Sequence, residues 1–319
     1  MLSRAQWIAI TVVGAALLAV PSTMAALDEP FYTSLIARIL VFAIAVVSLD
    51  LILGYGGMVS FGHAAYLGIG AYAVAIPSYY GIDNGYLQLL FAVGGSALVA
   101  LFIGAVSLRT SGLYFIMITL AFTQMLFYLG VSLEEYGGDD GINTNRSEFA
   151  SWIDLYDDAT LYYFVLACLA VCLVFSYRLV HSRFGRVIRG VHSNEARMQA
   201  MGFPTFRYKL TAFVISGAMC GVAGFLLANL TEFITPEYMQ WSRSGELMIM
   251  VLMGGMGTLF GAVLGAIGFI ALEEFIPDIL DLFGDGLGQH WSIVLGPLLV
   301  VLVLFARGGL WGLLPGRKP

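Results

Sequence analysis

The segment LIARILVFAIAVVSLDLIL, residues 35–53, decides the fold of this chain. It is an apolar run of about 20 residues, and a helix of that length crosses the hydrocarbon core of a bilayer. A strand of a membrane barrel would instead alternate apolar and polar residues over about ten positions. Because only helices and closed barrels satisfy their backbone hydrogen bonds within lipid, the segment predicts a membrane-spanning helix.

The composition of the whole chain is that of a membrane protein. Of 319 residues, 59% are hydrophobic and 11% are charged, whereas soluble domains average about 45–50% apolar and about 25% charged residues. The mean hydropathy is +0.87. These values exclude a soluble enzyme and a disordered chain. The net charge of −6 and the pI of about 5.1 argue against a nucleic-acid-binding protein.

Similar apolar runs recur along the chain and predict an all-α fold, a polytopic transmembrane bundle of about ten spans with interrupted, Gly-rich helices. The runs lie at residues 5–26, 35–53, 58–76, 87–108, 112–131, 161–180, 210–230, 247–257, 259–276 and 291–306. The run at 247–257 is short and counts as half a span or a full one. The first run fits a retained span better than a cleaved signal peptide, because its apolar core is long. We expect one transmembrane domain over residues 1–319.

The distribution of charge predicts which loops face the cytoplasm. Between Tyr177 and Lys209 the chain carries seven basic residues and one acid, whereas residues 132–158 carry eight acids and one base, Arg146. The positive-inside rule therefore makes 181–209 a cytoplasmic loop and 132–158 an external loop. Further basic residues near the chain ends place both termini in the cytoplasm and favour an even number of spans. These residues are Arg4, Arg307, Arg317 and Lys318.

The sequence offers no energy source of its own for transport. Asp50 is the main ionisable residue within a span, and a helix-end aspartate is a simpler interpretation than an ion-coupling site. Neither Lys209 nor Lys318 follows glycine, so a phosphate-binding loop is missing. The three cysteines lie within spans and assemble no metal site with a histidine, and we expect no catalytic pair and no cofactor. Any ATP hydrolysis therefore belongs to a partner.

A short helix is predicted inside the basic loop. Ser193 or Asn194 serves as the N-cap, and Glu195 falls in the first turn, where it favours the helix dipole. Gly202 ends the helix in a left-handed conformation. A helix of about eight residues is unstable alone in water. It therefore docks on a partner through Met198 and Met201, which share a face, or it lies on anionic lipid.

Clustered glycines predict two interruptions of the helices. A break beside Gly54, Gly56 and Gly57 would expose backbone groups that only a lined cavity or neighbouring protein can satisfy. The cluster from Gly254 to Gly257 is its expected counterpart. We therefore predict a wall of a translocation pathway at Gly56, Gly57, Ser60, His63, Gly254 and Gly255. Glycines spaced four apart, such as Gly217 and Gly221, predict close helix packing instead.

Three stretches of the sequence together resemble a known family. They are GYGGMVSFGHAAYLGIGAY (54–72), SRFGRVIRGVHSNEARMQAMG (182–202, continuing through YKLTAFVIS, 208–216) and ELMIMVLMGGMG (246–257). With their spacing they resemble permease subunits of branched-chain amino acid ABC importers, of the LivM type, over most of residues 35–310. That resemblance implies a second, homologous permease subunit, two cytoplasmic ATPase subunits and an external substrate-binding protein. It also implies a bacterial-type inner membrane.

The resemblance assigns the short helix to ATPase coupling. Coupling loops of ABC importers carry a Glu-Ala-Ala…Gly pattern, and Glu195, Ala196 and Gly202 take those places in this chain. The second alanine is replaced by Arg197, and the glycine follows the glutamate by one residue more than in the general motif. The implied coupling residues are Glu195, Ala196, Arg197, Met198, Met201 and Gly202.

The resemblance also implies a cargo. Branched-chain or other hydrophobic amino acids are the favoured solutes. A permease of the same family for urea, short amides or another small organic solute is the alternative, as is a stand-alone secondary transporter.

Overall fold

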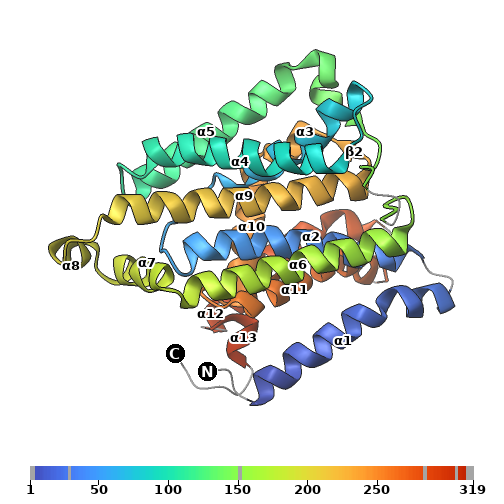
Figure 1. Cartoon of the computed structure of the whole chain (residues 1–319). Coiled ribbons are helices and arrows are strands. Elements are labelled where there is room, and N and C mark those ends of the chain that lie inside the picture. Colours follow the sequence, from blue (N-terminus) through green and yellow to red (C-terminus); the bar gives the residue numbers. More distant parts are fainter. Residues whose placement is uncertain (1–3, 28–29, 150–152, 283–285, 306–307, 314–319) are drawn as a thin grey trace.

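The computed structural model describes residues 4–27, 30–149, 153–282, 286–305 and 308–313. Over these residues the chain is all-α apart from one two-stranded ribbon (Figure 1). The long helices are α1 (Arg4–Leu27), α2 (Pro30–Leu53), α3 (His63–Tyr79), α4 (Gly85–Ser107), α5 (Leu113–Ser132), α6 (Asp158–His181), α9 (Thr205–Thr231), α10 (Trp241–Gly254), α11 (Leu259–Asp281) and α12 (Trp291–Phe305). Shorter helices are α7 (Arg183–Ser193), α8 (Glu195–Ala200) and α13 (Gly309–Leu313).

The all-α, polytopic membrane bundle is confirmed. Within the described residues, six helices are long and apolar enough to cross a membrane: α2 from Phe31, α4, α5, α6, α9 and α11. Each remaining apolar run also falls on a helix, but α3, α10 and α12 have 17, 14 and 15 residues. Helix α3 starts later than predicted, at His63, because the glycine-rich residues before it are not helical.

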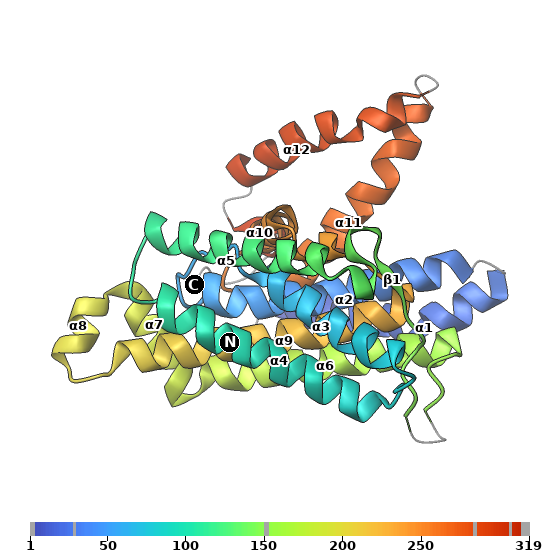
Figure 2. The same cartoon turned by 90° about the horizontal axis from the view of Figure 1, so that it is seen from above.

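Helix α9 lies in the middle of the bundle and packs against α2, α3 and α4 (Figures 1 and 2). Its glycines allow this approach, as the sequence predicts. A Cβ atom at Gly224 would lie 2.0 Å from the carbonyl oxygen of Leu67 on α3, and one at Gly221 would lie 2.6 Å from that of Ala92 on α4. The backbones of α3, α4 and α9 are therefore in direct contact.

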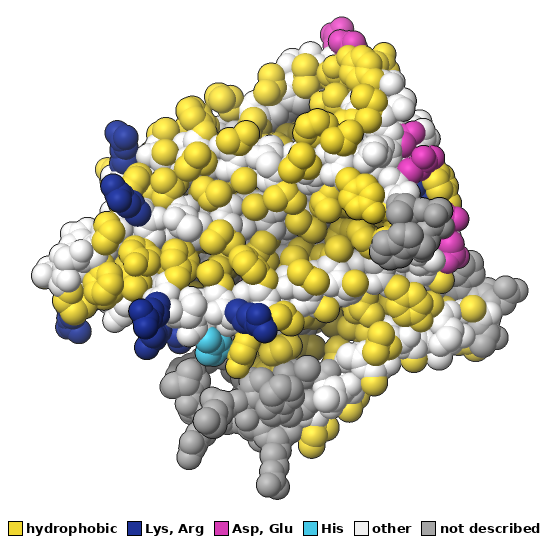
Figure 3. All heavy atoms as spheres, viewed as in Figure 1, with side chains coloured by type: hydrophobic (Ala, Val, Ile, Leu, Met, Phe, Trp, Pro, Cys, Tyr) yellow, Lys and Arg dark blue, Asp and Glu magenta, His cyan; other side chains and the backbone are white. Residues whose placement is uncertain are grey.

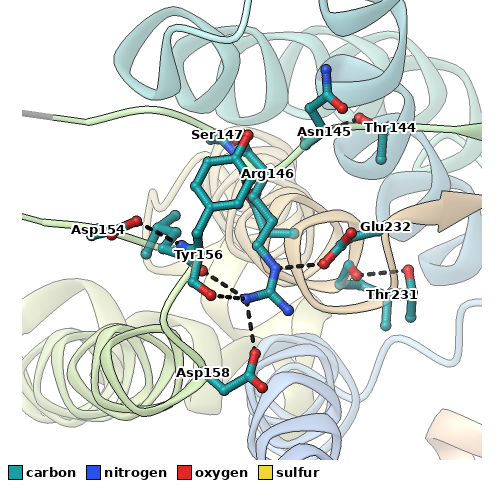
Figure 4. Close-up of polar contacts among 12 residues, drawn as sticks. Thr144, Asn145, Arg146, Ser147, Asp154, Tyr156, Asp158, Thr231 and Glu232 are labelled. Atoms are coloured by element: carbon teal, nitrogen blue, oxygen red, sulfur yellow. Dashed lines mark hydrogen bonds and ion pairs between the residues drawn. The ribbon is translucent and has the colours of Figure 1, made fainter.

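The predicted external loop forms an ordered structure at one end of the bundle. After the 3-10 helices η1 (Glu134–Tyr136) and η2 (Gly138–Asp140), strand β1 (Ile142–Asn143) pairs antiparallel with β2 (Phe233–Ile234), which follows α9. Arg146 is 12% exposed and lies between Glu232, at 2.7 Å, and Asp158, at 2.8 Å (Figure 4). It also donates to the carbonyl oxygens of Leu155 and Tyr156. This loop is thereby fixed to the ends of α6 and α9.

Charged side chains lie at opposite ends of the bundle. On the face seen in Figure 3, most Lys and Arg side chains lie toward the end that carries α7 and α8, and Asp and Glu side chains lie toward the end near β2. A band of hydrophobic side chains separates the two ends. This is the arrangement that the positive-inside rule describes for a membrane protein. The C-terminal charges Arg307, Arg317 and Lys318, on which the predicted placement of that terminus rests, lie outside the described residues.

Candidate functional site

The short helix in the basic loop is α8. Asn194 is its N-cap, because the Asn194 side-chain oxygen accepts a hydrogen bond from the Arg197 backbone N–H at 2.8 Å. Gly202 follows the helix with a φ of +85°, the left-handed conformation that was predicted. Helix α8 has six residues, fewer than the predicted eight or so, because it ends at Ala200 and the next two residues, Met201 and Gly202, form a turn.

One ion pair joins α8 to the start of α9. The Lys209 ammonium lies 2.7 Å from Oε1 of Glu195. The same oxygen accepts a hydrogen bond from the Thr205 hydroxyl at 3.0 Å. Lys209 is 14% exposed and Glu195 is 38% exposed, so the pair is partly shielded from water. The side chain of Glu195 therefore joins α8 to α9 through a charged contact.

The two methionines of this loop differ from the expected shared face. Met198 is 8% exposed and packs against Val187 and Val191 of α7, with Gly190 beneath its sulfur. Met201 is the C-cap residue of α8 and is 57% exposed. A single turn of helix resting on α7 must bury one side, and Met198 lies on that side. The exposed coupling candidates are Ala196, Arg197, Met201 and Gly202.

The two glycine-rich interruptions lie next to each other in space. The backbone N–H of Gly257, between α10 and α11, donates to Oδ1 of Asp50 at 2.8 Å. A Cβ atom at Gly54, after α2, would lie 2.2 Å from that same nitrogen. Asp50 is fully buried, so its side chain joins the two interruptions instead of reaching an interface. Gly254 and Gly255 are buried at this junction.

Ser60 and His63 are fully buried where α3 begins. The hydroxyl of Ser216 on α9 donates its single proton to the Ser48 carbonyl oxygen, so the His63 Nε2–H donates to Ser216 Oγ at 2.7 Å. The Ser60 hydroxyl oxygen accepts from the Gly62 backbone N–H at 3.1 Å. These residues lie in the packed core between α2, α3 and α9, and their place near a pathway stays a prediction.

The basic loop that carries α7 and α8 contacts the first interruption directly. Gly57 has a φ of +67°, and a Cβ atom there would lie 2.4 Å from Cδ2 of His192. His192 lies in the last turn of α7, just before α8. This contact is not predictable from the sequence, because Gly57 and His192 are far apart in the chain and neither carries a local signal for it. The loop that carries α8 therefore meets the glycine-rich segment before α3.

Among the described residues, no group of three or more His, Cys, Asp or Glu side chains is placed to hold a metal ion. Cys172 and Cys220 are buried free thiols, and Cys168 is a partly buried one.

Comparison with known proteins gives one consistent family. A family model described as the permease component of branched-chain amino acid transport systems matches residues 31–304. The chain is 29% identical over 306 residues to the high-affinity branched-chain amino acid transport system permease protein LivM of Escherichia coli K12, covering 88% of this chain and 69% of that protein. It is 24% identical to a probable LivM permease of Methanocaldococcus jannaschii, covering 87% and 91%. The LivH permease of Escherichia coli K12 is 24% identical, covering 85% and 91%.

Proposed function

The chain belongs to the family of permease components of branched-chain amino acid transport systems, and we propose that it forms half of the translocation pathway of an ATP-driven importer of hydrophobic amino acids. The match of the family model over residues 31–304 carries this conclusion. The protein is a multi-pass permease subunit and not an enzyme. The family model and the LivM and LivH relatives are all named for branched-chain amino acids, which favours that cargo over the alternatives.

The proposed topology has about ten crossings with α7 and α8 in the cytoplasm. The basic end of the bundle carries α7 and α8, and the acidic end carries β1 and β2 (Figure 3). In this orientation the short helices α3 and α10 each cross together with the non-helical residues that precede them. Both chain termini then lie in the cytoplasm.

The proposed partners follow from the family and from α8. LivM and LivH are both named as permease proteins of high-affinity branched-chain amino acid transport, which supports a pair of related permeases. We infer that one of two ATPase subunits docks at the exposed residues of the α8 segment, Ala196, Arg197, Met201 and Gly202, and that the other docks on the second permease. An external binding protein is proposed to deliver the amino acid to the acidic end.

We infer a mechanical route from the ATPase to the pathway. Movement of α8 reaches α9 through the Glu195–Lys209 ion pair. It reaches the segment before α3 through the contact of His192 with Gly57. That segment continues to Ser60 and His63 and is joined by Asp50 to the second interruption. The residues that the sequence predicts to line the pathway therefore lie at the end of this route.

Proteoliposomes that contain this chain with its second permease and ATPases test the proposal. We expect uptake of labelled leucine that requires ATP and the binding protein. Glu195→Arg should lower this uptake while the variant chain remains in the membrane. Glu134→Arg, in the external loop, is the matched charge reversal and should leave ATPase docking intact. Uptake by this chain alone, abolished by a proton uncoupler, would instead establish a secondary transporter.

A further inference from the structure

A cavity of about 350 Å³ lies between the coupling loop, the first interruption and the turn that joins α4 to α5. Its volume falls within the range of small-molecule sites, about 300–1,000 Å³. The residues that line it include the apolar Val59, Phe115 and Ile116. They also include the charged residues Glu195 and Lys209. The cavity therefore presents an apolar surface and a pair of opposite charges to the same space.

The Glu195–Lys209 ion pair leaves polar atoms available to bind a ligand. The contacts of Glu195 with Lys209 and Thr205 both use Oε1. The second oxygen of the carboxylate can therefore accept from an ammonium group, while the Lys209 ammonium has three donors and can also bind a carboxylate. Side chains of Thr110 and Ser111 line the same space and add hydroxyl groups.

We propose that this cavity binds one hydrophobic amino acid as a zwitterion, with its carboxylate at Lys209, its ammonium at Glu195 and its side chain against Val59, Phe115 and Ile116. The inference rests on the proposed function, because the proposed topology places the cavity on the side where the cargo is released. A neutral apolar solute would not pair with the charges of Glu195 and Lys209, and an ion without an apolar part would not pack against the apolar residues. A zwitterion with an aliphatic side chain makes both kinds of contact.

Occupancy of the cavity has a direct structural consequence. Its walls come from the α8 segment and from Gly56, Gly57 and Val59 of the first interruption. A bound amino acid therefore contacts both sides of the joint between His192 and Gly57. The cavity is thus a product site that senses the released cargo at the coupling joint.

Binding of labelled L-leucine to the complete permease–ATPase complex in nanodiscs, without the binding protein, tests the proposal. We expect saturable binding of leucine. Two analogues should each compete at least about tenfold more weakly than unlabelled leucine. They are 4-methylpentanoate, which lacks the ammonium, and 3-methylbutylamine, which lacks the carboxylate. Lys209→Gln should weaken leucine binding by about tenfold or more. Ser111→Trp should block it by filling the cavity from an exposed turn.

Arg207→Gln is the matched control, because Arg207 is an exposed cation on the same helix that does not line the cavity. It should bind leucine as the wild type does. The inference is overturned if Lys209→Gln and Ser111→Trp both bind leucine with wild-type affinity, or if both analogues compete as well as leucine. ATP-driven uptake by the same wild-type complex, measured separately, shows whether the proposed function stands when the cavity does not bind.

Discussion

Replacing Gly57 by alanine would place a methyl group where the ring of His192 now lies. Two costs follow. A φ of +67° is unfavourable for alanine by about 1–2 kcal/mol. The new Cβ atom, 2.4 Å from Cδ2 of His192, forces that ring out of its position, at about 0.5–1.5 kcal/mol for a displaced rotamer. We expect Gly57→Ala to lower the free energy of unfolding by about 1.5–3.5 kcal/mol.

Gly81 provides the matched control for the backbone cost. It has a φ of +73°, and a Cβ atom there would meet no atom within 4 Å. Gly81→Ala should therefore lose only the about 1–2 kcal/mol of the left-handed conformation. In a His192→Ala background, Gly57→Ala should lose the same smaller amount, because the ring is gone.

The assay combines stability with coupling. Unfolding of the purified complex in mixed detergent micelles gives the free energies, and proteoliposomes give leucine transported per ATP hydrolysed. We expect Gly57→Ala to lower this ratio severalfold and Gly81→Ala to leave it unchanged. Equal destabilisation by Gly57→Ala with and without His192, together with an unchanged ratio, would refute the idea that this contact links the coupling loop to the pathway.

Three further perturbations test other parts of the structure. Asp50→Ala leaves the N–H of Gly257 without its acceptor and should cost about 1–3 kcal/mol of unfolding free energy, whereas Asp50→Asn keeps an acceptor oxygen and should cost less. Arg146→Met removes a cation held by two carboxylates and two carbonyls and should cost about 1–3 kcal/mol, with faster hydrogen exchange in β1 and β2 as the readout. The pKa of Asp157 is lowered because the hydroxyl and N–H of Thr160 donate to its carboxylate. The stabilisation of α6 by Asp157 is therefore present above the carboxyl pKa of the unfolded chain and is lost as pH falls through the lower pKa of the folded protein. Asp157→Ala should cost about 1 kcal/mol of unfolding free energy near neutral pH. In thermal melts, the difference between this variant and the wild type should vanish in acid.

Features set by nearby residues were predictable from the sequence. Long apolar runs predict helices because the thickness of the bilayer and the rise per residue of a helix fix the number of apolar residues that a span needs. The cap at Asn194 and the left-handed Gly202 depend only on a few adjacent residues. The missed helix α7 also carried a local signal: the Ser182 hydroxyl caps it, and Val187, Ile188 and Val191 form its buried face.

Contacts between distant segments were not predictable in the same way. Asp50 is interpreted from sequence as a helix-end residue, and nothing near it indicates that Gly257 supplies its hydrogen bond. The contact of Gly57 with His192 and the position of Arg146 between α6 and α9 depend likewise on how helices assemble. Apolar periodicity does not specify neighbours within lipid, because all faces of such helices are hydrophobic. The membrane class was therefore predictable from the sequence, and the contact between Gly57 and His192 was not.

The glycine seam of α9 has a consequence for how the permease changes shape. Where Gly221 meets Ala92 and Gly224 meets Leu67, backbone lies against backbone, and no flexible side chain separates the helices to absorb sliding. Helices α3, α4 and α9 are therefore expected to shift as one rigid body. We expect a push delivered at Lys209 to turn the whole unit, so that alternating access would come from that unit moving against its neighbours while the individual helices stay straight.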